Sequence, residues 1–90
     1  MKTYRVLFEK AATRTLSKMD RAQANLIVGW ITKNLDGCEN PRLHGKALQG
    51  NHRDKWRYRV GDYRLIAHIS DTEITILILN IGHRRDIYKR

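Results

Sequence analysis

The fold is decided by residues 56–66, which read WRYRVGDYRLI. Apolar and basic side chains alternate on both sides of Gly61-Asp62, a dipeptide typical of a two-residue β-hairpin turn. Such a turn requires positive φ, which glycine adopts without steric cost. The stretch therefore predicts a hairpin in which Val60 lies opposite Tyr63.

The same register brings three arginines together. Side chains alternate between the two faces of a sheet, so Arg57, Arg59 and Arg64 share one face, and Arg59 lies directly opposite Arg64. Like charges that face each other across strands are destabilising. A phosphate placed between them would turn that repulsion into attraction. The pattern favours a phosphate-binding surface over the alternative, a sheet face with its arginines spread into water.

Working outward, the chain predicts a single α+β domain over residues 1–90. A β-rich run is followed by two helical stripes, a loop, the hairpin and an almost wholly apolar β-branched segment. The second helix begins at an N-cap, Asp20, with Gln23 placed as in a capping box, and ends near Gly37. The expected elements are a strand over 2–8, helices over 9–19 and 21–36, and strands over 56–60, 63–69 and 74–81. They form a mostly antiparallel sheet of three to four strands after the N-terminal strand, with a helical hairpin on one face. The last strand is expected to be central and covered on both faces.

Residues 38–55 are expected to form a loop that Leu43 and Leu48 hold against the domain. Gly45-Lys46 is not a phosphate-binding P-loop, because Asn40 replaces the first glycine and Ala47 replaces the magnesium-binding hydroxyl. The four histidines show no short metal-ligand spacing, and the single Cys38 cannot complete a zinc site. We therefore expect no metal and no cofactor.

Composition agrees with a polyanion or an acidic protein as the partner. Eighteen Lys and Arg oppose nine Asp and Glu, a net charge of +9, and arginine suits bidentate phosphate contact. No apolar run reaches the length of a membrane span, and the first residues do not resemble a signal peptide. With only one cysteine, an intracellular, cytoplasmic protein is the expectation.

A second basic group follows the last predicted strand. If that strand pairs with the one carrying Arg64, then Arg84 or Arg85 and Tyr88 can reach the same surface. RNA cleavage needs a base for the 2′-hydroxyl, stabilisation of the phosphorane and an acid for the leaving oxygen. Arginines supply the stabilisation, and Tyr88 and His83 are the candidates for the base.

The segments 56–66 and 82–88, the loop over 41–50 and the helical hairpin together resemble the RelE/ParE toxin superfamily, in particular its RelE branch. The resemblance covers nearly the whole chain. It implies a toxin of a type II toxin–antitoxin system that enters the A site of the 30S ribosomal subunit and cleaves messenger RNA there. It also implies a RelB-like antitoxin as partner, and contact with operator DNA only through the toxin–antitoxin complex.

The resemblance also implies roles for individual residues. Arg57 and Arg59 stand where the family has basic residues, often Lys, that line the cut, and Arg64 stands at its phosphate-stabilising arginine. Arg84 resembles the arginine that follows the last core strand, and Tyr88 resembles the C-terminal tyrosine assigned to base or stacking work. Arginine barely titrates, so its presence at the first two positions leaves the proton donor open.

The remaining candidates are a further acid or base, His83, and five residues expected to bind RNA: Lys46, Arg53, Lys55, Arg85 and Lys89. Two other functions stay open, namely a ParE-like inhibitor of DNA gyrase and a basic binding module without chemistry. Ile66 and Leu77 share the face of the arginines and would form an exposed apolar patch on a free domain. We expect the antitoxin to cover part of that face or an adjoining edge strand.

Overall fold

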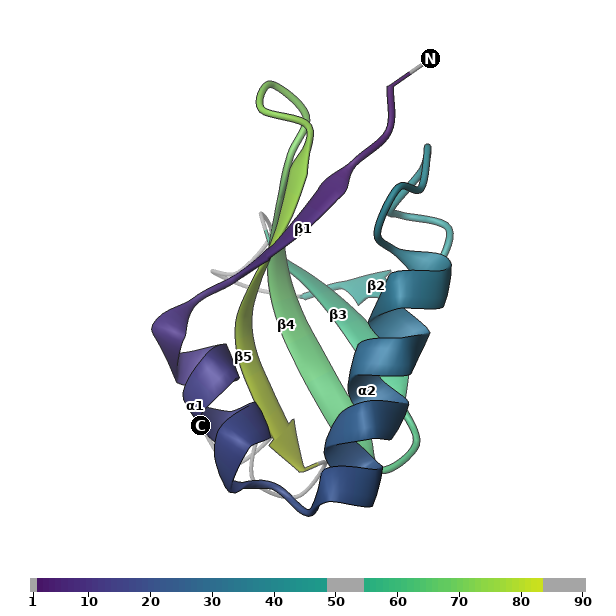
Figure 1. Ribbon diagram of the computed structural model, residues 1–90. Helices are drawn as coiled ribbons and strands as arrows, with labels where there is room; N and C mark the ends of the chain where they lie inside the picture. The colour runs from purple at the N-terminus through teal and green to yellow at the C-terminus, as the bar shows by residue number, and fades with distance from the viewer. Residues whose placement is uncertain (1, 49–54, 84–90) are drawn as a thin grey trace.

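The computed structural model describes residues 2–48 and 55–83. Two helices lie on one face of a five-stranded sheet (Figure 1). The elements are β1 (Arg5–Phe8), α1 (Lys10–Lys18), α2 (Arg21–Asn34), β2 (Lys46–Ala47), β3 (Lys55–Val60), β4 (Tyr63–Ser70) and β5 (Thr75–His83). The strand order is β1-β5-β4-β3-β2, with β1 parallel to β5 and every other pair antiparallel. The predicted α+β class and the predicted β4–β5 pairing are both confirmed.

The helices begin and end close to the predicted residues. Asp20 caps α2 as expected, because its carboxylate accepts a hydrogen bond from the Ala22 amide at 3.1 Å. Gly37 has a φ of +82°, the left-handed conformation with which chains commonly leave a helix. The local signals in the sequence were therefore sufficient to delimit the helical hairpin.

The predicted hairpin register is also confirmed. Val60 pairs with Tyr63 and Arg59 with Arg64, around a turn in which Gly61 has a φ of +60°. Farther along β4 a bulge between Ile66 and Ala67 shifts the pairing with β5 by one residue.

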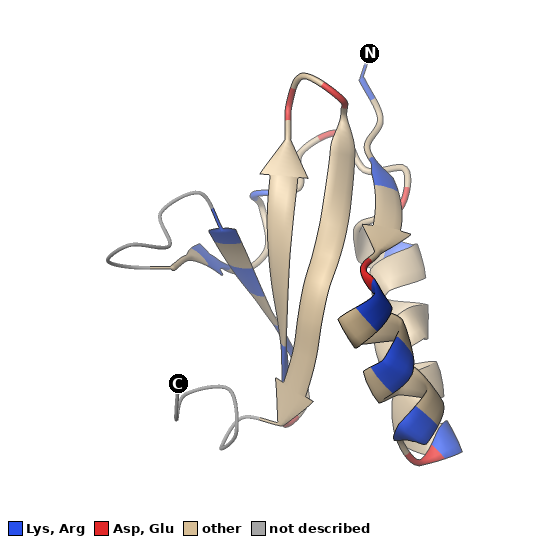
Figure 2. Ribbon diagram, turned by 90° about the vertical axis from the view of Figure 1, so that its left-hand side faces the viewer, with Lys and Arg blue, Asp and Glu red and all other residues tan. Residues whose placement is uncertain are grey.

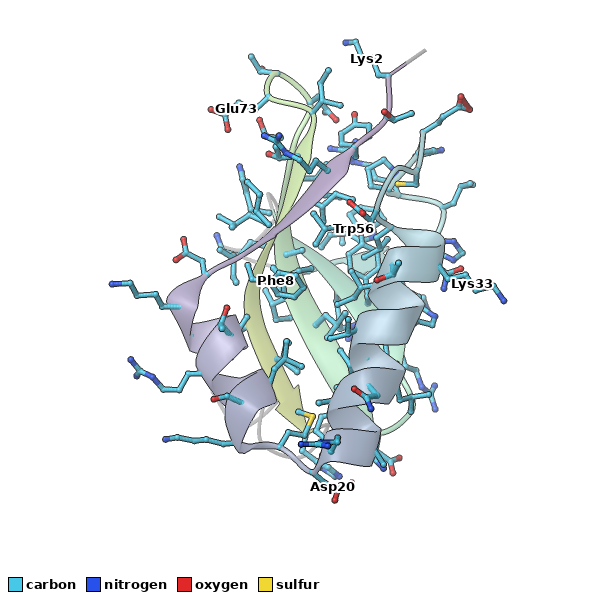
Figure 3. The ribbon with its side chains drawn as sticks, viewed as in Figure 1. Lys2, Phe8, Asp20, Lys33, Trp56 and Glu73 are labelled. Carbon is cyan, nitrogen blue, oxygen red and sulfur yellow. The ribbon has the colours of Figure 1, made fainter. Side chains whose placement is uncertain are left out.

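The core lies between the sheet and the two helices, where side chains fill the space in front of the strands (Figure 3). Ile27 and Ile31 of α2 and Ala12 of α1 meet the inward side chains of the strands. Those buried strand residues are Tyr58, Val60, Leu65, Ala67, Ile69, Ile76, Ile78 and Ile81. No helix of the described residues is long and apolar enough to span a membrane.

The structure corrects the expectation that the last strand is covered on both faces. Ile76, Ile78 and Ile81 are buried on the helix side, whereas Leu77 and Leu79 remain partly exposed. Helices cover only one face of this sheet, so an apolar β-branched run did not require burial on both faces.

Within the described part of the predicted loop, residues 46–47 form the short strand β2, and Leu43 does not hold the loop in place. Leu43 is 76% exposed. Two polar contacts to β3 fasten the loop instead: the Tyr58 hydroxyl donates to the Pro41 carbonyl at 2.7 Å, and the Trp56 indole N–H donates to the His44 carbonyl. These contacts bring the chain alongside β3, where Lys46 and Ala47 form β2.

A polar cluster fastens the same loop to the β4–β5 turn. The Tyr4 hydroxyl donates to Asp71 at 2.6 Å, and the Arg42 guanidinium binds both oxygens of the same carboxylate at 3.0 and 3.1 Å. These hydrogen bonds lower the pKa of Asp71. The cluster ties the N-terminal segment, the loop before β2 and the β4–β5 turn together.

Candidate phosphate-binding site

A depression of about 220 Å³ lies on the sheet face away from the helices, because its strand residues alternate with those that face the core. Its lining consists of Gly45, Lys46, Arg57, Arg59 and Arg64, from three neighbouring strands and the residue before β2. No acidic residue is among these lining residues. Figure 2 shows the Lys and Arg positions in blue along β2 and β3, the strands farthest from the helices in that view. Four cations around one concave surface form a site that attracts an anion.

Strand register explains why these four side chains meet. Lys46 pairs with Arg57 across β2–β3, and Arg59 pairs with Arg64 across β3–β4. Directly opposed residues on antiparallel strands have Cβ atoms about 4.5–5.5 Å apart and project to the same face. Arg57 and Arg59 are two positions apart on β3, so both pairs lie on one face.

Arg64 is more buried than the other two arginines of this face. Arg64 shares the predicted face, but only 7% of the residue is exposed, and its Nη1 donates to the Tyr63 carbonyl at 3.3 Å. The reason is its place on β4, the middle strand of five, where neighbours on both sides cover its stem. Arg59, on β3, is exposed. The site therefore combines a buried arginine, Arg64, with a solvent-facing one, Arg59. The long side chain of Arg59 can move to contact a ligand.

His83 is not brought together with the arginines. It pairs with Tyr63, the position next to the Arg64–Gly82 pair, so its side chain lies on the other face of the sheet. The two rings meet edge to face with centroids 5.6 Å apart. This placement disfavours His83 as the base at the arginine site.

The other predicted site residues divide into two groups. Lys55 begins β3, is partly buried and pairs with His68, two positions from Arg57 on the same strand. The remaining ones lie outside the described residues: Arg53, Arg84, Arg85, Tyr88 and Lys89.

Three comparisons define the relationship of this chain to known proteins. A family model described as the ParE toxin of the type II toxin–antitoxin system parDE matches residues 6–88. The chain is 33% identical to Toxin RelG of Mycobacterium tuberculosis over 87 residues, which are 97% of this chain and 98% of the relative. The chain belongs to the RelE/ParE superfamily of type II toxins.

Solved structures agree with this assignment. The toxin–antitoxin complex RelBE2 of Mycobacterium tuberculosis contains a chain similar to this toxin with a TM-score of 0.83 and 31% identity, covering 96% of this chain and 97% of that one. The archaeal RelE–RelB complex of Pyrococcus horikoshii gives a TM-score of 0.71 and 25% identity, covering 93% and 98%. The isolated RelE toxin of E. coli shares the fold, with a TM-score of 0.72 at 20% identity over 96% of this chain and 92% of that one.

Sequence reasoning missed the role of Gly45 in this toxin. Gly45 has a φ of +78°, and a Cβ atom on it would overlap the Arg57 carbonyl oxygen and lie 3.0 Å from Trp56 Nε1. Only glycine allows β2 to approach β3 this closely. The available signal was the Gly45-Lys46 dipeptide itself, which matches only a fragment of the P-loop motif.

Neither a cluster of metal ligands nor an activated thiol is seen among residues 2–48 and 55–83. No three His, Cys, Asp or Glu side chains in this part of the chain are grouped to hold a metal ion. Burial raises the pKa of the Cys38 thiol, which disfavours the thiolate that a nucleophile requires.

Proposed function

We propose that this toxin is a ribosome-dependent endoribonuclease that cleaves messenger RNA in the A site of the 30S subunit without a metal ion. The observation that carries the proposal is the depression in which Arg59 opposes Arg64 and Arg57 lies beside Lys46. A phosphodiester placed there would gain contacts from several cations, and none of the described lining residues is acidic.

The chemistry follows from what RNA cleavage requires. The ribose 2′-hydroxyl attacks the adjacent phosphorus, and negative charge develops on the non-bridging oxygens of the phosphorane. Guanidinium groups of Arg59 and Arg64 would stabilise that charge. Arg84 and Tyr88 keep the roles that the family resemblance implies, a further phosphate contact and the base or a stacking partner. Cleavage is slow unless the 2′-hydroxyl is aligned with the phosphorus and the leaving oxygen. A ribosome that holds the RNA in this alignment would contribute part of the rate enhancement.

Inhibition of DNA gyrase is the second candidate function. It is favoured by the matching family model, whose description is that of a ParE toxin. The depression favours phosphodiester chemistry over it, because several guanidinium groups around one concave site can stabilise the negative charge of a phosphorane.

We also propose a RelB-like antitoxin as the cytoplasmic partner. The M. tuberculosis and P. horikoshii relatives are both toxin–antitoxin complexes. On this toxin, the partly exposed Ile66 and Leu77 lie on the same face as the arginines. An antitoxin segment with acidic and apolar residues would cover both the arginines and the apolar side chains of that face. Hydrogen exchange of the complex tests this, since a face that stays as accessible as in the free toxin contradicts the proposal.

The decisive experiment induces the wild-type toxin, Arg59→Ala and Arg64→Ala in bacteria and maps transcript ends by primer extension. Arg59 is exposed, so its removal should abolish cleavage while leaving the thermal midpoint within about 2 °C of the wild type. Arg64 is buried, so its variant is expected to lose stability as well as activity. Arg14→Ala on α1, far from the depression, is the charge-matched control and should cleave normally.

New ends inside translated reading frames that disappear in Arg59→Ala would establish a ribosome-dependent nuclease. Growth arrest with intact transcripts would instead point to gyrase, and a supercoiling assay would then replace the RNA assay. RNA binding without cleavage would favour the third function, a basic binding module without catalytic activity.

A further inference from the structure

The cations around the depression differ in one property that matters for cleavage. Arg57, Arg59 and Arg64 end in guanidinium groups, which hold their protons at any pH a protein tolerates. Of the four basic side chains described there, Lys46 alone ends in an ammonium that can give up a proton. The leaving 5′ oxygen of RNA needs such a proton, and the arginines can only stabilise charge.

Lys46 is held beside the arginines by three features of the described structure. It pairs with Arg57 across β2–β3, so both side chains project to the arginine face. Gly45 permits the close approach of the two strands. The Trp56 indole donates to the His44 carbonyl, and the Trp30 ring meets the His44 ring edge to face at 5.7 Å, which fixes the residues just before β2.

The Lys46 side chain is exposed, whereas its backbone is fixed by pairing. A long side chain on a fixed backbone can reach across the depression without a change of fold. It approaches from β2, the edge strand, and Arg64 approaches from β4, so a phosphate between them would have cations on two sides.

We propose that Lys46 is the general acid of this toxin and protonates the leaving 5′ oxygen. This inference rests on the proposed ribonuclease function. In the step, the bond from the 2′ oxygen to phosphorus forms and the bond from phosphorus to the 5′ oxygen breaks. The general base takes the 2′-hydroxyl proton and later releases it to water, and a proton from the Lys46 ammonium goes to the 5′ oxygen. The products are a 2′,3′-cyclic phosphate and a 5′-hydroxyl, and the neutral amine regains its proton from water.

The test compares two synthetic messenger RNAs on programmed ribosomes. One has a normal linkage in the A-site codon, and the other has sulfur in place of the bridging 5′ oxygen. A thiol has a pKa near 8.5, so a thiolate leaves without needing a proton. Lys46→Arg keeps the positive charge and removes the transferable proton. Lys33→Arg on α2, which points away from the sheet (Figure 3), is the matched control.

Lys46→Arg should cleave the normal linkage about 100-fold or more slowly than wild type, the usual contribution of a general acid. On the sulfur linkage the two proteins should cleave within about threefold of each other, because the acid is no longer needed. Lys46→Ala should be slow on the normal linkage and partly rescued on the sulfur linkage. Lys33→Arg should match the wild type on both.

Three outcomes would overturn the inference. Lys46→Arg cleaving the normal linkage at the wild-type rate would show that no proton from Lys46 is used. An equal loss on both linkages would show that Lys46 only binds RNA or maintains structure. If the wild type cuts neither linkage while still arresting growth, the ribonuclease function itself fails, and the general acid fails with it.

Discussion

Gly45→Ala is the perturbation whose cost the structure defines best, because Gly37→Ala provides a matched control. Both glycines have positive φ, +78° and +82°. Alanine in the left-handed region costs about 1–2 kcal/mol at either position. At Gly37 a Cβ atom meets nothing within 4 Å, so this backbone term is the whole expected cost.

At Gly45 a second term is added. The new Cβ atom would overlap the Arg57 carbonyl oxygen and lie 3.0 Å from that carbonyl carbon. Backbone cannot give way as a flexible side chain can, so β2 must separate from β3. The separation sacrifices the pairing of Lys46 and Ala47 and the bond from the Leu48 amide to the Lys55 carbonyl. Two or three hydrogen bonds at about 1 kcal/mol each make Gly45→Ala about 2–3 kcal/mol worse than Gly37→Ala.

Thermal unfolding of the two purified variants measures this difference. For a domain of this size about 1 kcal/mol shifts the melting temperature by 4–8 °C, so Gly45→Ala should melt roughly 8–24 °C below Gly37→Ala. Urea denaturation should give the same order with unchanged m-values. Equal losses in the two variants would refute the reasoning, since they would mean that β2 tolerates the added atom.

Three further results are expected. Tyr58→Phe removes the hydroxyl that donates to the Pro41 carbonyl inside the core and should lower the free energy of unfolding in urea by about 1–3 kcal/mol, whereas a loss near zero would show that this bond does not stabilise the loop. Hydrogen bonds from Arg42 and Tyr4 lower the pKa of Asp71 in the folded protein, so the stability from this carboxylate is fully present above its unfolded pKa of about 3.9 and is lost as the pH falls through the folded pKa. The melting temperature of the wild type should therefore fall toward that of Asp71→Asn below about pH 4. A difference in melting temperature between the two proteins that stays constant with pH would contradict this. Affinity for a single-stranded RNA oligonucleotide should fall steeply with salt, and Arg57→Ala should reduce the log–log slope by about 0.7, the value for one phosphate contact; an unchanged slope would mean that Arg57 does not touch a phosphate.

Local structure and the pairing of the arginines follow from short-range signals in the sequence. The Asp20 cap, the Gly37 terminus and the Gly61-Asp62 turn are short-range signals whose chemistry acts within a few residues. A two-residue turn leaves a single register, so the Arg59–Arg64 pair followed from counting. The alternation of arginine with apolar residues likewise put the three arginines on one face, as the register confirms. That this face binds phosphate, which the +9 charge favours, stays a prediction.

The tertiary structure decided how that face is completed, because this depends on contacts between residues far apart in the chain. The loop before β3 carries no periodic signal, and it joins the sheet only because Tyr58 and Trp56 hold it and Gly45 admits it. That contact brings Lys46 to the arginines.

Burial was decided in the same way. Arg64 is covered because β4 has a neighbour on each side, which alternation along a single strand does not reveal. His83 lies on the opposite face because its pairing with Tyr63 comes one position after that of Arg64 with Gly82. Alternation within a strand is local and can be read from the residues, whereas strand order and the packing of a loop against a distant strand exist only once the chain has folded.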